Sequence, residues 1–153
     1  MMKITEVDKK ILRIIQKNAT LSQTELAEMA NMSRSSFWRH VKDMEDAGII
    51  ILQAPAIDER KIGLKLRASC VITLNNHSHD VREEFESHIL QMPNVLECYA
   101  TSGGKDYMLT VVAKDMDDYY ELMSSSILDH PTIESAHTSF VMKKIKSTTL
   151  LPI

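Results

Sequence analysis

The sequence has few of the features that would place it outside the cell or in a membrane. It contains only two cysteines among its 153 residues, with no CxxC pair and no Cys/His spacing typical of a metal site. No apolar run approaches the roughly 18 residues of a membrane-spanning helix, and the opening MMKITEVDKKI has no apolar signal-peptide segment. We therefore expect a cytoplasmic protein in which Cys70 and Cys98, each inside an apolar strand-like segment, are reduced and buried.

Motifs that carry catalysis are also missing. The sequence has no nucleophile elbow, no phosphate-binding loop and no HExxH motif. His77 and His79 form the closest histidine pair, but they fall in a predicted turn, where solvated side chains are more frequent than metal ligands. Asp115, Asp117 and Asp118 fall at the start of a predicted helix, where carboxylates complement the helix dipole. The sequence therefore predicts no catalytic residues and no metal site.

The sequence does contain a helix-turn-helix pattern, and its last helix carries a basic surface. Apolar residues at helical spacing predict three short helices, over residues 6–18, 22–30 and 33–47. Thr5, Ser22 and Ser33 can cap their N-termini, and Gly48 is placed to end the third helix. The helically spaced apolar residues of the first helix are Val7, Ile11, Ile14 and Ile15. The three helices predict one small core, filled by Ile4, Leu12, Leu26, Ala27, Ala30, Phe37, Val41, Met44 and Ile49.

The third predicted helix has the character of a recognition helix. It carries four basic residues, including Arg39 and His40, and no acid between Ser33 and Lys42. A basic N-terminal half is typical of the helix that enters the DNA major groove. The predicted DNA-binding residues lie on the second and third helices: Ser22, Gln23, Arg34, Ser35, Ser36, Trp38, Arg39 and Lys42.

Two alternatives stay open for this surface. The helix can be a solvated charged helix of an ordinary bundle, and Trp38 can be half-buried against the first helix. Arg39 can contact a guanine edge or a phosphate, whereas Lys42, farther along the helix, favours a phosphate.

The net charge of −3 does not argue against DNA binding, because the acidic residues are unevenly distributed along the chain. Residues 1–55 hold eight Lys/Arg and seven Asp/Glu, whereas residues 56–153 hold ten and fourteen.

The pattern changes after Pro55. An apolar run over 49–54 predicts a connecting strand and is followed by a linker. Beyond it, alternating and amphipathic segments predict four strands and two helices in the order β-α-β-β-α-β, the ferredoxin-like motif. These elements are strands 66–74, 95–102, 107–113 and 133–142, and helices 80–92 and 115–129. The fold class is α+β, with a helix-turn-helix DNA-binding domain at 1–54, a linker at 55–65 and an αβ-sandwich domain at 66–153.

The predicted sheet leaves one face without a helix. Both helices cover the same face in this topology, and both residue series of the first strand are rather apolar. An uncovered, partly apolar face predicts a partner sheet, most simply from a second copy of the chain. The closing KKIKSTTLLPI can be an extra edge strand, or a tail that contacts DNA or a neighbour.

The chain resembles the leucine-responsive/asparagine-responsive (Lrp/AsnC, feast/famine) transcriptional regulators over nearly its whole length. The resemblance rests on VDKKILRIIQKNATLSQTELAEMANMS, RHVKDMEDAGII, IDERKIGL, SGGKDYML and the closing STTLLP, in that order. SGGKDYML is similar to the Gly-x-Tyr-Asp-Tyr turn of the family. Lys105 departs from the aromatic residue often found there, and Ser35-Ser36 stand where Thr-Pro or similar small residues are common.

The resemblance implies a winged or extended helix-turn-helix joined to a ligand-response domain. It also implies dimers through the second domain, often assembled into octamers, and a small effector, usually an amino acid, bound between dimers near a turn. By position, this turn is Ala100, Thr101, Ser102, Gly103, Gly104 and Asp106. Glycines allow backbone amides to approach a carboxylate, and Asp106 can receive an ammonium group. A tight hairpin turn that needs glycine is the simpler alternative.

A neighbouring subunit is expected to complete the effector pocket through Thr138 and Ser139, which favours a small or polar amino acid. We therefore expect a regulator that binds double-stranded DNA and responds to an amino acid, with no other cofactor and no membrane partner. The alternatives are a ligand-independent architectural DNA-binding protein, a protein-interaction module built on the three helices, or a small-molecule-binding protein or enzyme using the ferredoxin-like domain.

Overall fold

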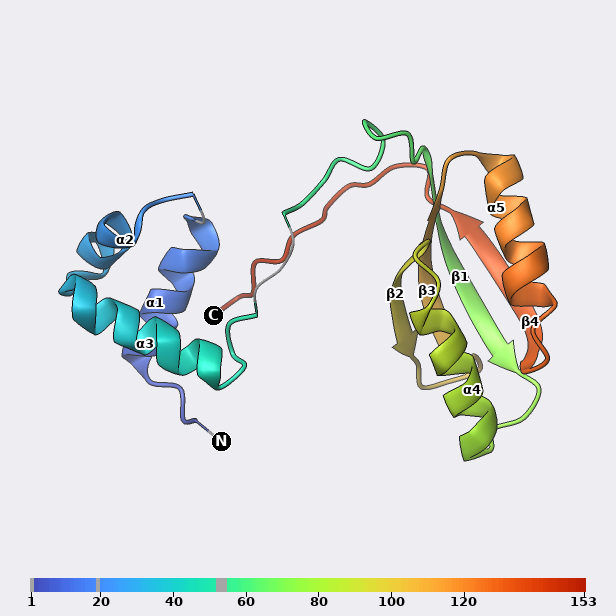
Figure 1. Cartoon of the computed structure of the whole chain (residues 1–153), viewed down its shortest axis with the longest axis horizontal. Helices are drawn as coiled ribbons and strands as arrows, with labels where there is room; N and C mark the ends of the chain where they lie inside the picture. Colours follow the sequence, from blue (N-terminus) through green and yellow to red (C-terminus); the bar gives the residue numbers. More distant parts are fainter. Residues whose placement is uncertain (1, 19, 52–54) are drawn as a thin grey trace. The chain divides into compact units, whose positions relative to one another are not determined.

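The computed structural model describes residues 2–18, 20–51 and 55–153, which group into two compact units. The helical unit comprises Met1–Pro55 together with Lys146–Ile153, and the sheet unit comprises Ala56–Ile145 (Figure 1). The last eight residues, which the predicted domain division counts with the sheet, thus group with the helices. No helix in the described ranges has the length and apolar content needed to cross a membrane.

The helical unit contains α1 (Glu6–Lys17), α2 (Gln23–Ala30) and α3 (Arg34–Asp46). The three predicted N-caps are confirmed: Thr5 and Ser22 each form a capping box, and the Ser33 hydroxyl accepts a hydrogen bond from the Ser36 backbone N–H. Asn31 adopts the left-handed conformation, at φ 56°, that turns the chain from α2 towards α3. Local signals in the sequence therefore account for each boundary of the helix-turn-helix.

The core of the helical unit is smaller than predicted. Six predicted residues are fully buried: Ile11, Ala27, Ala30, Phe37, Val41 and Met44. Val7, one of the helically spaced apolar residues, and Ile49, a predicted core residue, are exposed, because Asp8 takes the inward position in the first turn of α1 and the chain leaves α3 at Gly48, at φ 69°. The predicted strand 49–54 is absent over its first three residues, and residues 52–54 lie outside the described part.

Asp8 is the buried charge of the helical unit, with only 1% of its surface exposed. One carboxylate oxygen accepts hydrogen bonds from the Thr5 backbone N–H and hydroxyl, at 2.9 and 2.6 Å. The other lies 2.8 Å from Nδ1 of His40 on α3. Burial would raise the pKa of Asp8, but the hydrogen bonds from Thr5 and His40 outweigh it and hold this pKa below its usual value. His40, counted above as a basic residue of α3, thus joins α3 to α1.

The C-terminal tail lies along α1. The backbone N–H of Leu151 donates to Gln16 Oε1 at 2.6 Å, and Arg13 Nε donates to the backbone oxygen of Ile153 at 2.7 Å. No strand follows Phe140 in the described chain, so the tail is not an edge strand of its own sheet.

The sheet unit has the predicted order of elements. These are β1 (Leu66–Leu74), α4 (His79–Leu90), β2 (Val95–Ala100), β3 (Tyr107–Ala113), α5 (Met116–Leu122), the π-helix η1 (Met123–Leu128) and β4 (Ile133–Phe140). The antiparallel sheet has the order β2-β3-β1-β4, which confirms the ferredoxin-like topology. The helix predicted over residues 115–129 consists of two segments, the α-helix α5 and the π-helix η1. The Ser124 and Ser125 hydroxyls donate to the carbonyls of Tyr120 and Glu121, which weakens the regular α-helical pattern there.

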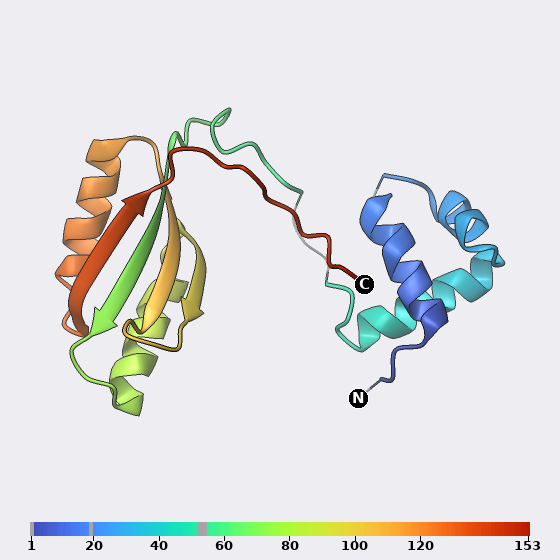
Figure 2. The same ribbon diagram turned by 180° about the vertical axis from the view of Figure 1, so that it is seen from behind.

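The helices α4 and α5 cover the same face of the sheet, and no described helix covers the opposite, bare face (Figures 1 and 2). Residues 68, 70, 72 and 74 of β1 are buried under the helices, as the alternation predicted. Cys98, which was predicted to be buried, is exposed because it lies on the edge strand β2, where one side has no neighbouring strand. Two apolar residues of α5, Met116 and Tyr120, also point to solvent.

The bare face carries an apolar row. In the strand register Val71 pairs with Met108, and Met108 pairs with Tyr99. Val71 and Met108 alternate with the buried positions of β1 and β3, and Met108 and Tyr99 are exposed.

We expect Asp8→Ala to lower the free energy of unfolding of the helical unit by about 2 kcal/mol at neutral pH, because it removes half of the capping box and the hydrogen bond to the partly buried His40. The stabilisation needs an ionised Asp8. The loss of unfolding free energy relative to wild type should therefore be complete above pH 3.8, the usual pKa of an aspartate. It should disappear as the pH falls through the lowered pKa of Asp8.

Urea unfolding followed by the fluorescence of Trp38, the single tryptophan, reports on this unit. Glu6→Ala, which removes an exposed acid from the same turn, is the control and should change little. Equal losses in the two variants would contradict the prediction.

Candidate nucleic-acid interface and effector cleft

The surface of α3 opposite its core stripe is basic and exposed. Phe37, Val41 and Met44 point into the core, so residues on the other side of the helix face solvent. Of the predicted DNA-binding residues on α3, five are exposed and Ser36 is half-buried; the exposed ones are Arg34, Ser35, Trp38, Arg39 and Lys42. Trp38 retains 40% of its exposure, which leaves its ring available on the flank of the helix.

The cations of this surface differ in their availability. Lys42 Nζ lies 2.9 Å from Asp46 Oδ1, and this hydrogen bond raises the pKa of Lys42. Arg34 and Arg39 have no ion-pair partner within the described part of the chain. A phosphate must displace the exposed Asp46 to reach Lys42, at small cost, whereas it meets the two arginines directly.

The start of α2 is less available than the sequence suggested. The Ser22 hydroxyl and backbone N–H both donate to Glu25 Oε2, at 2.6 and 2.8 Å, and these bonds lower the pKa of Glu25. An ionised carboxylate therefore occupies the helix end where a phosphate would otherwise bind. Gln23 remains partly exposed beside it.

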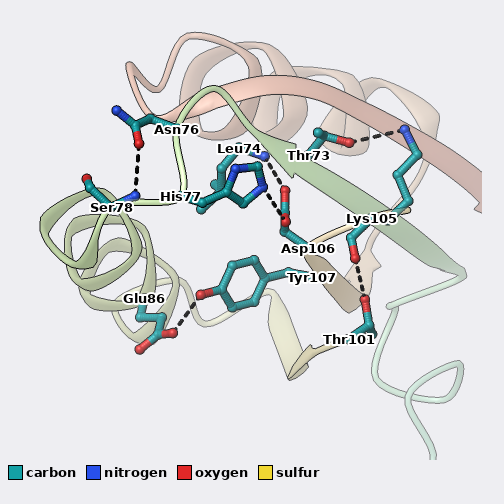
Figure 3. Close-up of polar contacts among 10 residues, drawn as sticks. All are labelled: Thr73, Leu74, Asn76, His77, Ser78, Glu86, Thr101, Lys105, Asp106 and Tyr107. Atoms are coloured by element: carbon teal, nitrogen blue, oxygen red, sulfur yellow. Dashed lines mark hydrogen bonds and ion pairs between the residues drawn. The ribbon is translucent and has the colours of Figure 1, made fainter. Parts of the chain in front are cut away.

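A second candidate site is a cleft of about 470 Å³ in the sheet unit. It lies where the β1–α4 connection, α4 and the β2–β3 turn come together (Figure 3). Its walls are mostly polar and charged: Leu74, His77, His79, Arg82, Glu83, Glu86, Ala100, Thr101, Asp106 and Tyr107.

Asp106 is held rigidly at this cleft. Its backbone N–H donates to the Ile72 carbonyl, and its Oδ2 accepts from the Leu74 backbone N–H at 2.8 Å. Its Oδ1 accepts from His77 Nε2, also at 2.8 Å (Figure 3). Only 20% of the Asp106 side chain is exposed. The carboxylate thus has a fixed position and two hydrogen-bond partners.

The neighbouring residues close the turn. Thr101 donates its backbone N–H to the Asp106 carbonyl and its hydroxyl to the Lys105 carbonyl, both at 2.8 Å. Lys105, the departure from the family pattern, reaches Thr73 Oγ1 at 3.1 Å (Figure 3). Its ammonium therefore points to β1 rather than into the cleft lining.

One lining residue of the cleft is a protonated phenol. Tyr107 donates its hydroxyl to Glu86 Oε1 at 2.6 Å (Figure 3). Burial, and then the adjacent Glu86 carboxylate, raise the pKa of Tyr107 well above its usual value. Tyr107 therefore stays a hydrogen-bond donor, and one acid of the cleft is already engaged.

The structure brings together only part of the predicted effector set. Ala100, Thr101 and Asp106 line the cleft, whereas Ser102, Gly103 and Gly104 lie in the turn outside its lining. Gly103, at φ 128°, has a conformation that side chains rarely adopt, so the turn itself requires glycine there.

Thr138 and Ser139 lie away from this cleft in the same chain. The Thr138 hydroxyl is 2.7 Å from that of Tyr119, under the helices. Ser139 is exposed and pairs with Ser69 in the sheet. Their contribution from a neighbouring subunit stays a prediction.

Sequence reasoning missed the α4 side of the cleft. The sequence pattern favoured solvated turn residues for His77 and His79, and it singled out neither Arg82 nor Glu86. His77 and Asp106 are 29 residues apart. Their contact depends on the pairing of Ile72 with Tyr107, which no local pattern reveals.

Comparison with known proteins matches both parts of the chain to described families. Residues 4–51 match a winged helix-turn-helix DNA-binding family, and residues 67–151 match the Lrp/AsnC ligand binding domain. The chain is 35% identical over 150 residues to the transcriptional regulator AzlB of Bacillus subtilis, covering 98% of this chain and 96% of that protein. It is also 35% identical over 150 residues to the DNA-binding transcriptional activator DecR of Escherichia coli, covering 98% of this chain and 99% of that protein.

Solved structures agree with these relatives. A Neisseria meningitidis transcriptional regulator in complex with L-Met is 34% identical and superposes with a TM-score of 0.91, covering 98% of this chain and 97% of that one. An AsnC family regulator from Agrobacterium tumefaciens is 32% identical, with a TM-score of 0.90 and 97% of each chain covered.

We expect Arg39→Ala to weaken specific DNA binding by about 1–3 kcal/mol, because a guanine or phosphate contact of this kind contributes that much. Binding-site selection from mixed genomic fragments, followed by gel-shift titration at fixed salt, measures the change. Lys17→Ala, which removes an exposed cation from the end of α1, is the control. Wild-type affinity in a folded Arg39→Ala protein would exclude this contact.

Proposed function

The chain belongs to the Lrp/AsnC family of DNA-binding transcriptional regulators, and we propose that an α-amino acid bound beside Asp106 controls its binding to DNA. One observation carries this proposal. The fixed Asp106 carboxylate and the Arg82 side chain line the same cleft, so that complementary charges are available for the two ends of a zwitterion. The family consists of regulators rather than enzymes.

The proposed contacts follow from the unused hydrogen-bonding capacity of these groups. Each Asp106 oxygen has two acceptor sites, and the Leu74 and His77 bonds leave capacity for an ammonium group. Arg82 has no ion-pair partner among the described residues and can form a paired hydrogen bond with the α-carboxylate.

The cleft also limits the ligand side chain. A volume of about 470 Å³ suits a small molecule. Glu83 and Glu86 on its walls disfavour an acidic side chain. The L-Met bound to the Neisseria relative supports the ligand class. We further propose that Thr138 and Ser139 of a neighbouring subunit close the side-chain end of the site, which favours a small or polar amino acid.

On the DNA side, we propose that α3 enters the major groove. Arg34, Ser35, Trp38 and Arg39 lie on the exposed surface and near the N-terminal end of the helix, where bases are usually read. Lys42 is assigned a phosphate contact. The helix-turn-helix domain, residues 1–54, is joined by the 55–65 linker to the response domain.

Coupling between the two sites requires assembly states that differ in ligand affinity. We propose that the bare sheet face, with its Val71–Met108–Tyr99 row, pairs with that of a second copy to form a dimer. Four such dimers would form an octamer, with effector sites between dimers. An amino acid that binds one assembly better than another would then shift DNA binding.

We expect Arg82→Gln and Asp106→Ala each to weaken amino-acid binding at least tenfold, because each removes one end of the zwitterion contact. Calorimetric titration of the twenty amino acids first identifies the ligand, and the variants are then compared with it. Arg82→Gln leaves the Asp106 turn intact, so it separates recognition from folding.

Asp80→Ala, an exposed acid of α4 outside the cleft, is the matched control. If an amino acid binds wild type and both cleft variants equally, the site is elsewhere. If none of the twenty binds at millimolar concentration, amino-acid control is wrong, whereas DNA binding through α3 is tested separately.

We expect the double substitution Tyr99→Glu/Met108→Glu to convert the assembled protein into monomers, because charge would be buried between apposed sheets. Sedimentation at micromolar concentration measures this. Leu90→Glu/Tyr120→Glu places the same charges on exposed apolar residues of the helices and should leave the assembly unchanged. A dissociation equal in both variants would argue against the sheet face.

A further inference from the structure

The sheet unit contains a second cleft, of about 330 Å³, whose lining is mainly basic. It lies between the turn at 58–65 and the segment that follows β4, which run side by side in both views (Figures 1 and 2). Two acids and five cations line it, in a chain whose net charge is −3; the cations are Arg60, Lys65, Arg67, Lys143 and Lys144.

Both acids of this cleft already have partners. Asp58 Oδ1 accepts the backbone N–H groups of Arg60 and Lys61, at 3.1 and 3.4 Å, and so caps the turn. Glu59 lies between two cations, 2.5 Å from Arg67 Nη1 and 3.6 Å from Lys144 Nζ. The Glu59 and Arg67 side chains are only 19% and 24% exposed. The two acids therefore position parts of the cleft and leave it with an excess of three positive charges.

The remaining cations converge without counter-charges. Arg60, Lys65 and Lys143 have no side-chain ion pair or hydrogen bond within the described part of the chain. They come from two segments about 80 residues apart in sequence, which the cleft brings together. Like charges gathered in a concave site repel one another and attract an anion of matching charge.

We propose that this cleft binds a small polyphosphate anion, such as the phosphate chain of a nucleoside polyphosphate. Its excess of three positive charges matches several phosphate charges better than a single carboxylate. Arginine forks and lysine ammonium groups are the side chains that bind phosphate oxygens. The Asp106 cleft does not suit such a ligand, because three carboxylates line it. The protein thereby gains a second ligand, independent of the amino acid.

Titration of the full-length protein with inorganic tripolyphosphate tests the site. We expect measurable binding to wild type and at least tenfold weaker binding to Lys65→Gln/Lys143→Gln. The control Lys61→Gln/Lys114→Gln removes the same charge from lysines outside the lining and should stay within twofold of wild type. Absence of binding to wild type, or equal loss in both double variants, would overturn the proposal.

A gel-shift series over salt concentration separates the two sources of phosphate. DNA affinity falls with salt by a slope of roughly 0.9 per phosphate contacted. A small-anion site leaves that slope unchanged in Lys65→Gln/Lys143→Gln. A shallower slope in this variant alone would overturn the small-anion assignment and identify the ligand as the DNA backbone. Neither measurement depends on amino-acid binding at Asp106.

Discussion

The antiparallel pairing of β1 with β3 is the constraint on which the regulatory half of the protein depends. It sets Ile72 opposite Tyr107, so that the chain leaves β1 beside the residue that precedes β3. Asp106 then receives the Leu74 backbone N–H and the His77 ring, and its carboxylate is fixed at the mouth of a cleft. A slip of one residue would turn every side chain of the pair to the opposite face. The sheet core and the effector cleft are therefore specified by the same register.

The charged residues of this protein are segregated into separate surfaces, which the net charge does not reveal. The helical unit buries Asp8 against His40 and so joins α1 to α3, while the two exposed arginines of α3 have no acidic partner among the residues that the structure describes. The sheet unit separates an acidic cleft around Asp106 from a basic cleft around Glu59. Each surface can thus attract a different ligand from the same solution, because clefts concentrate the field of the groups that line them. A net charge of −3 conceals this division.

Much of the fold was predictable, because its signals are local. Capping residues mark the helix starts, and alternation marks β1, so that the order of elements and the ferredoxin-like topology were confirmed. The errors arise where a neighbour overrides the pattern. Val7 is exposed because Asp8 takes its place, and Cys98 is exposed because its strand lies at an edge. The serines at 124–126 look neutral in a helical pattern, yet the hydroxyls of Ser124 and Ser125 bond to backbone carbonyls where α5 passes into a π-helix.

By itself, the sequence determined the helix-turn-helix, the basic face of α3 and the kind of domain that follows, since these depend on periodicity and on residue types close together in the chain. The tertiary structure alone decided which polar groups share a site. It brought His77, Arg82 and Glu86 to Asp106, directed His40 to Asp8, and set the 58–65 turn beside the segment after β4. The reason is physical: chain reversal and strand register bring together residues separated by 20 to 80 positions, and no local pattern in the sequence records those distances.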